Sequence, residues 1–262
     1  MTQTGISLGL CSVTLRALSI DDVVRTAAVA GVAGIEWGSD VHVHDAASAA
    51  YARTATEAAG LSVLSLGSYY RAGSFGDFGG VLALAAELGA SRIRIWAGDV
   101  GSAEATGAQW DAVVEDTQRI AGLATARGAG LAFEYHGGTL TDSSATTLEL
   151  LRRVDRRAVG TYWQPAVGLD DGQALESLSQ VIGQIVGVHC FSWWPNAERL
   201  PLAARTQLWQ GVSNVLHAHG RDLDVMLEFV VGDLPANVIT DAAFLIDALG
   251  CSGRQTTPAG HL

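Results

Sequence analysis

One pattern recurs along the chain: an alanine-rich amphipathic stretch, then a glycine, then a short apolar run. It appears in the segments AVAGVAGIEW, EAAGLSVLSL, AELGASRIRIW, TARGAGLAFEY and HAHGRDLDVMLEF. Each glycine stands where a helix end needs a left-handed residue. Gly31, Gly60 and Gly89 are 29 residues apart, which suits one strand and one helix per interval. The chain is therefore predicted to repeat a βα unit.

Eight short apolar runs are predicted to be strands separated by helices. They cover residues 6–11, 34–37, 62–66, 92–96, 131–135, 159–164, 187–191 and 225–230. Near-continuous apolar runs are typical of parallel strands buried on both faces. Eight such repeats favour a closed barrel over an open doubly wound sheet. We expect an α/β fold, a single-domain (β/α)8 TIM barrel over residues 1–250, with a C-terminal tail over residues 251–262.

Composition excludes several classes of protein. The 262 residues carry a net charge of −11 without a cluster of basic residues, so neither nucleic acid nor an anionic membrane is an expected partner. No run approaches the roughly 18 apolar residues that span a bilayer, and no targeting segment is evident. The three cysteines are far apart and lack CxxC spacing, which is typical of reduced thiols. We expect a cytoplasmic protein with a small-molecule partner, and a homo-oligomer remains open.

Polar side chains end the strands predicted in the second half of the chain: Glu134, Gln164, His189 and Glu228. In a (β/α)8 barrel these carboxyl ends form the active site. A carboxylate buried there is costly unless it is paired or binds a cation. Two carboxylates, an imidazole and an amide oxygen suit Mn²⁺, Mg²⁺, Co²⁺ or Zn²⁺. The four residues therefore predict one metal site, although a single strand-end glutamate is more often solvated or salt-bridged.

The chain also resembles the sugar phosphate isomerase/epimerase family, the xylose-isomerase-like TIM barrels. The similar segments are GIEWGSDVHVHD (34–45), LGSYYRAG (66–73), SRIRIWAG (91–98), LAFEYHGGTLTD (131–142), TYWQPAVG (161–168), VHCFSWWP (188–195) and VMLEFV (225–230). The resemblance implies a divalent cation, Mn²⁺ first, held by Glu, Asp, His and Glu from the last four strands. Glu134, His189 and Glu228 match three of these positions. Gln164 replaces the aspartate, and hydroxypyruvate-isomerase-like members use a glutamine among their four ligands.

This resemblance implies proton-transfer chemistry. A metal that chelates a hydroxyl and the adjacent carbonyl acidifies the carbon between them and stabilises an enediolate. Glu134 and Glu228 are the catalytic candidates that remove and return the proton. The expected function is a metal-dependent isomerase or epimerase acting on a sugar, cyclitol or related polyhydroxylated carbonyl compound. The alternatives are a lyase (dehydratase) of the same barrel class and a non-catalytic barrel that binds a ligand or partner, which Gln164 favours.

Six further residues, near strand ends or in the loops that follow, are candidates for contacting the substrate: His136, Glu36, His42, Trp96, Arg71 and Trp193. His136 follows Glu134 by two positions and so points to the same side of its strand. The tryptophans would stack on a sugar face. For each of the six, an ordinary role in packing or hydrogen bonding is the alternative.

Overall fold

The predicted apolar runs form the eight parallel strands of one closed barrel. A computed structural model describes residues 5–251. Its barrel strands are β1 (Ile6–Cys11), β2 (Gly34–Gly38), β3 (Ser62–Arg71), β4 (Arg92–Trp96), β5 (Gly130–Phe133), β6 (Val159–Trp163), β7 (Ile185–Cys190) and β10 (Leu223–Leu227). They are hydrogen-bonded in chain order, and β10 closes the barrel by pairing with β1. The prediction of a (β/α)8 barrel is confirmed.

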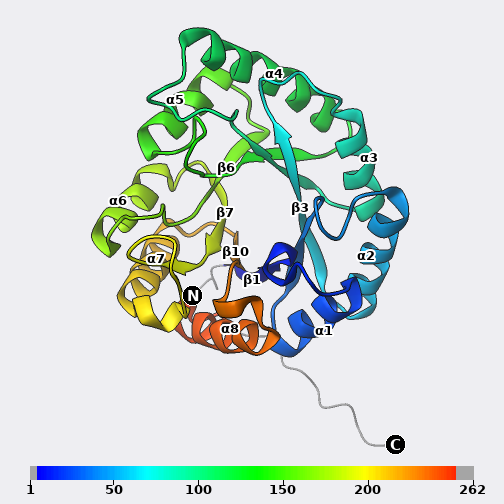
Figure 1. Cartoon of the computed structure of the whole chain (residues 1–262), viewed down its shortest axis with the longest axis vertical. Coiled ribbons are helices and arrows are strands. Elements are labelled where there is room, and N and C mark those ends of the chain that lie inside the picture. The colour runs from blue at the N-terminus through cyan, green and yellow to red at the C-terminus, as the bar shows by residue number, and fades with distance from the viewer. Residues whose placement is uncertain (1–4, 252–262) are drawn as a thin grey trace, which may run out of the picture.

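Helices surround the barrel and alternate with its strands (Figure 1). They are α1 (Ile20–Ala30), α2 (Ala46–Ala58), α3 (Gly79–Leu88), α4 (Gly107–Thr125), α5 (Ser144–Val154), α6 (Asp171–Val181), α7 (Thr206–His219) and α8 (Pro235–Leu249). The loops carry three 3₁₀ turns and a small hairpin: η1 (Ser12–Leu15), η2 (Leu202–Arg205), η3 (Val231–Asp233), β8 (Ser192–Trp193) and β9 (Arg199–Leu200).

The helix ends follow local sequence chemistry. The side chain of Ser19 accepts the backbone N–H of Asp22 at 3.2 Å and begins α1. Gly31, Gly89 and Gly220 end α1, α3 and α7 with left-handed backbone angles, as the repeated glycines predicted. These signals fix where each helix turns back toward the next strand.

The barrel interior carries charge as well as apolar side chains. Arg92 and Arg94 alternate with isoleucine on β4, so both point to the same side of the strand. Arg92 forms an ion pair with Asp224 of β10, a strand that does not neighbour β4, so the contact crosses the interior. A small inner apolar cluster contains Cys11, Val13, Ala132, Tyr162 and Met226. The main apolar core lies between the strands and the helices.

Two predictions concern segments at or beyond the edge of the barrel. Of the predicted tail over residues 251–262, only Cys251 is among the described residues, so the division of the chain at residue 250 stays a prediction. Between residues 5 and 251, no helix combines the length and the apolar character needed to cross a membrane.

Close strand packing at β2 leads to a prediction for stability. A Cβ at Gly34 would lie 2.5 Å from the backbone oxygen of Ser62 on β3, so Gly34→Ala must displace a strand. We expect it to lower the free energy of unfolding by about 1–3 kcal/mol, measured by urea denaturation. Gly122→Ala on α4 is the control, because a Cβ there meets nothing within 4 Å. That control should be neutral or stabilising, and equal destabilisation by both changes would contradict the packing argument.

Candidate active site

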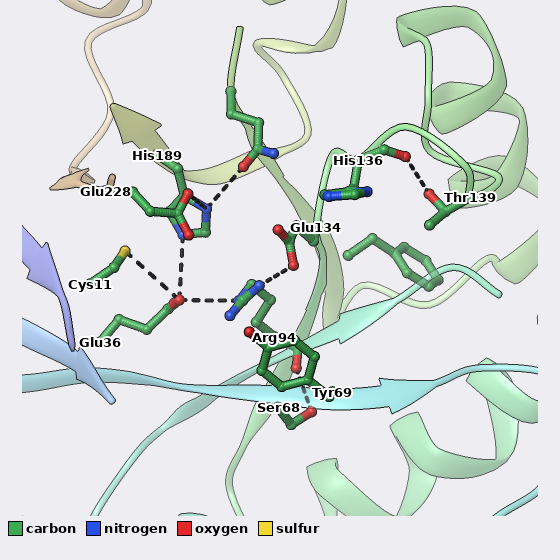
Figure 2. Close-up of polar contacts among 12 residues, drawn as sticks. Cys11, Glu36, Ser68, Tyr69, Arg94, Glu134, His136, Thr139, His189 and Glu228 are labelled. Atoms are coloured by element: carbon green, nitrogen blue, oxygen red, sulfur yellow. Dashed lines mark hydrogen bonds and ion pairs between the residues drawn. The ribbon is translucent and has the colours of Figure 1, made fainter. Parts of the chain in front are cut away.

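The four residues predicted as metal ligands lie together at the carboxyl end of the barrel. Figure 2 shows three of them: Glu134, His189 and Glu228. His189 is on β7, and the other three directly follow β5, β6 and β10. Ligand atoms of Glu134, His189 and Glu228 all lie within 4.8 Å of one another. The Oε1 atom of Gln164 is 3.2 Å from Nδ1 of His189. The structure thus brings together oxygen and nitrogen donors from four consecutive barrel strands.

A buried arginine joins two carboxylates beside this group. Arg94 is 2% exposed; one terminal nitrogen forms an ion pair with Glu134, and its Nε lies 3.1 Å from Oε1 of Glu36 (Figure 2). Burial opposes the charge of Arg94, but Glu134 and Glu36 raise its pKa well above its usual value. Burial likewise opposes the charge of Glu36, yet Arg94 and His189 hold the pKa of that carboxyl well below its ordinary range. Arg94 and Glu36 therefore remain charged inside the barrel.

His189 faces oxygen atoms on both ring nitrogens. Its Nδ1 is 3.2 Å from Gln164 and 3.6 Å from Oε2 of Glu228, while its Nε2 is 3.5 Å from Oε1 of Glu36. The ring stacks on Tyr162 with centroids 4.6 Å apart. Burial disfavours the charged imidazolium, but Glu228 and Glu36 raise the pKa of His189. The ring is consequently fixed in its plane and in its orientation.

Glu228 has the least satisfied carboxylate of the group. It is 3% exposed, and among the described residues its Oε2 atom has no hydrogen-bond partner. Burial raises the pKa of Glu228 to about 7, against the opposing charge of His189. The next residue, Phe229, has φ of 53°, a left-handed angle that strains a non-glycine residue and that often marks functional sites. A buried, unsatisfied carboxylate is the kind of group that a cation would stabilise.

A cavity of about 520 Å³ opens above these side chains. Glu134, Gln164 and Glu228 line it. Three of the residues predicted to contact the substrate line it as well: Trp96, His136 and Trp193. The ring centroids of Trp96 and His136 are 4.4 Å apart, and the guanidinium carbon of Arg71 lies 4.4 Å from the centre of the Trp96 ring. Arg71 does not line this cavity but a second one against α4.

Three residues predicted to contact the substrate do not line the cavity: Glu36, His42 and Arg71. Glu36 is 2% exposed and points into the barrel toward Arg94. His42 is buried, and its ring nitrogens lie 3.1 Å from Oγ of Ser12 and 3.1 Å from the carbonyl oxygen of Leu18. Neither Glu36 nor His42 reaches the space in which a substrate would lie.

Sequence reasoning missed Arg94. The signal was present in the strand segment RIRIW, where arginine alternates with isoleucine and must enter the barrel if isoleucine faces the helices. The predicted site consisted mainly of residues at or beyond strand ends, whereas Arg94 lies within β4.

The donor set fits a divalent cation. Glu134, Gln164 and Glu228 offer oxygen atoms and His189 offers Nδ1, a combination that Mn²⁺ and related ions accept. Arg94 engages one oxygen of Glu134, and a carboxylate has a second. The unpartnered oxygen of Glu228 lies on the same side of His189 as Gln164.

Comparison with known proteins assigns the chain to a family. The profile of the family described as "Xylose isomerase-like TIM barrel" matches residues 24–247, so the chain belongs to that family. No curated protein matches it.

Several solved structures share the fold. The chain is similar to the probable 3-DHS dehydratase AsbF of Bacillus anthracis, with a TM-score of 0.75 and 20% identity over 91% of this chain and 98% of that one. For D-psicose 3-epimerase of Clostridium cellulolyticum H10 the TM-score is 0.73 and the identity 13%, over 94% and 100% of the two chains. For 3-keto-D-glucoside 4-epimerase, YcjR, of E. coli they are 0.70 and 15%, over 94% and 100%. At these identities the similarity shows a common fold.

The buried charges lead to a prediction for stability. Arg94→Met would leave Glu36 and Glu134 without their shared cation inside the barrel. We expect the free energy of unfolding to fall by about 3–5 kcal/mol, measured by urea denaturation. Arg53→Met is the control, because Arg53 pairs with Glu57 on the exposed surface and should contribute little. A loss for Arg94→Met as small as that of the control would contradict the pairing.

Proposed function

We propose that this protein is a metal-dependent isomerase or epimerase that acts on a sugar, cyclitol or related polyhydroxylated carbonyl compound. The observation that carries the proposal is the meeting of Glu134, His189 and Glu228 within 4.8 Å at the floor of a cavity. Membership of the xylose isomerase-like family and the similarity to sugar epimerases support it.

Glu134, Gln164, His189 and Glu228 are the residues that would hold the cation, with Mn²⁺ as the first candidate and Mg²⁺, Co²⁺ and Zn²⁺ as alternatives. When bound, a divalent ion there supplies positive charge beside the substrate oxygens, where an enediolate develops negative charge. Family membership and the donor set support this cofactor.

The two glutamates have different surroundings, which suits an acid–base pair. Glu134 forms an ion pair with Arg94, whereas burial raises the pKa of Glu228 to about 7. Pairs of carboxyl groups with unlike surroundings can divide the accepting and the donating roles between them. Glu134 and Glu228 would therefore remove and return the proton of the substrate.

The cavity favours an uncharged ring. Aromatic side chains form much of its wall, from both sides: Tyr69, Trp96, Phe191, Trp193 and Phe229. Such rings stack on the C–H face of a cyclic polyol. Arg94 is the one cation among the described lining residues, and two carboxylates already engage it. The chain contains no lysine. A phosphate group inside the cavity would thus meet Glu134, Asp142 and Glu228, while Arg71 lies against Trp96 outside the lining, so the proposed substrate is not phosphorylated.

A dehydratase is the second candidate. The enediolate that an isomerase reprotonates can instead expel a β-hydroxyl group, with the same carboxylates acting as base and acid. The similarity to the probable 3-DHS dehydratase of Bacillus anthracis favours this candidate. The nature of the product distinguishes the two, since elimination leaves a compound lighter by one water.

Glu228→Gln tests the proposal. The protein would be incubated with Mn²⁺ in deuterated buffer with a panel of ketoses and keto-cyclitols and their phosphate esters. We expect the wild-type protein to incorporate deuterium beside the carbonyl of an unphosphorylated member and Glu228→Gln to lose this exchange, because an amide cannot accept the proton. Mass spectrometry measures both exchange and loss of water.

The control is Glu115→Gln on the exposed face of α4, which should exchange like wild type. Thermal unfolding of all three proteins would show that the fold is retained. Undiminished exchange by Glu228→Gln would remove this residue from the acid–base pair.

A further inference from the structure

We propose that Glu36 is a positioning residue for His189: its carboxylate lies opposite Nε2, attracts the Nε2–H group and thereby directs Nδ1 at the candidate metal position. This role differs from the substrate contact that the sequence suggested for Glu36. It rests on the proposed function only in so far as a metal binds at Nδ1.

The first observation is the placement of the two ring nitrogens. Nε2 of His189 is buried and has no hydrogen-bond partner within the described part of the chain, and Oε1 of Glu36 is 3.5 Å away. On the other side of the ring, Nδ1 faces Gln164 and Glu228, two of the proposed ligands. The stack on Tyr162 restrains the plane of the ring. The carboxylate of Glu36 at Nε2 and the proposed metal ligands at Nδ1 therefore define one orientation of the His189 ring.

The second observation is that Glu36 is itself fixed from several strands. Oγ of Ser65, on β3, donates to Oε2 of Glu36 at 2.6 Å. Nε of Arg94, on β4, lies 3.1 Å from Oε1, and Sγ of Cys11, on β1, lies 4.0 Å from the same oxygen (Figure 2). These contacts leave the carboxylate little freedom to turn away from His189. Because Glu36 does not line the cavity, any effect on the site must pass through its neighbours.

The chemistry of metal-binding histidines explains why such a residue is needed. A histidine ligates through the lone pair of one nitrogen, and a carboxylate that accepts from the other nitrogen fixes the tautomer and the ring orientation. Removing such a partner weakens metal affinity without removing a ligand. Arg94 offsets the charge of Glu36, so the carboxylate can stay ionised beside the imidazole. Together, Arg94, Glu36 and His189 link β4, β2 and β7 across the barrel.

Two substitutions of Glu36 separate this role from simple charge balance. Glu36→Gln keeps an oxygen that can accept from Nε2–H, whereas Glu36→Leu has a similar size and no acceptor; both remove the negative charge. We expect Mn²⁺ titration calorimetry on the full chain to show affinity near wild type for Glu36→Gln. For Glu36→Leu we expect affinity about 10- to 100-fold weaker. Equal losses in both variants would show that Glu36 acts through the charge of Arg94, and would overturn the proposal.

Asp224→Asn is the matched control. It changes another carboxylate that pairs with an arginine inside the barrel, although Asp224 is only partly buried, and it has no contact with His189 among the described residues. We expect it to lower stability while leaving Mn²⁺ affinity unchanged.

A measurement on the metal-free protein keeps the proposal testable if no metal binds or if Glu36→Leu does not fold. Nitrogen-15 NMR of the histidine rings reports which nitrogen of His189 carries a proton. We expect a proton on Nε2 in the wild-type protein and in Glu36→Gln. A bare Nε2 in the wild-type protein would overturn the positioning role, whereas absence of Mn²⁺ binding together with a protonated Nε2 would overturn only the metal dependence.

Discussion

The charge of Arg94 inside the barrel is the constraint on which the candidate site depends. A buried guanidinium is tolerated only with counter-ions close to it, and Glu134, by a hydrogen bond, and Glu36, at 3.1 Å from Nε, supply them. His189 then lies between Glu36 and Glu228, so charged and polar groups alternate across the interior. The site is therefore a connected network in which each group limits where its neighbours can go.

That network also distinguishes the two glutamates proposed to exchange protons. Glu134 forms an ion pair with Arg94. Glu228 is buried beside His189, and one of its oxygens has no hydrogen-bond partner among the described residues. A cation bound between them would complete the coordination of Glu228 and would use the oxygen of Glu134 that Arg94 leaves free. The proposed chemistry thus needs both the ion and the guanidinium, which would share Glu134.

Much of the fold could be predicted from the sequence because the βα repeat is local. Apolar runs, capping residues and left-handed glycines are set within a few residues of each other, and Gly31 and Gly89 end their helices as predicted. The convergence of Glu134, Gln164, His189 and Glu228 could also be predicted, since the barrel brings the ends of its strands together. No long-range detail of packing was required for either inference.

The remaining parts depend on register and loop conformation, which periodicity does not specify. Glu36 pairs in register with Cys11 on β1, and β2 continues to Gly38, so Glu36 lies below the mouth rather than at it. The N–H of His42 bonds to the carbonyl of Gly38 at 3.2 Å, and this turn carries the ring to η1. Which carboxylates Arg94 meets likewise depends on how β2, β4 and β5 align. The register between strands and the path of a loop cannot be predicted from the sequence of one strand.

The most direct test of the account is anomalous X-ray diffraction from crystals of the protein soaked in Mn²⁺. The account predicts one strong manganese peak in contact with Glu134, Gln164, Nδ1 of His189 and Glu228. A map with no peak there, in which the oxygen of Glu228 has found a protein partner, would contradict it.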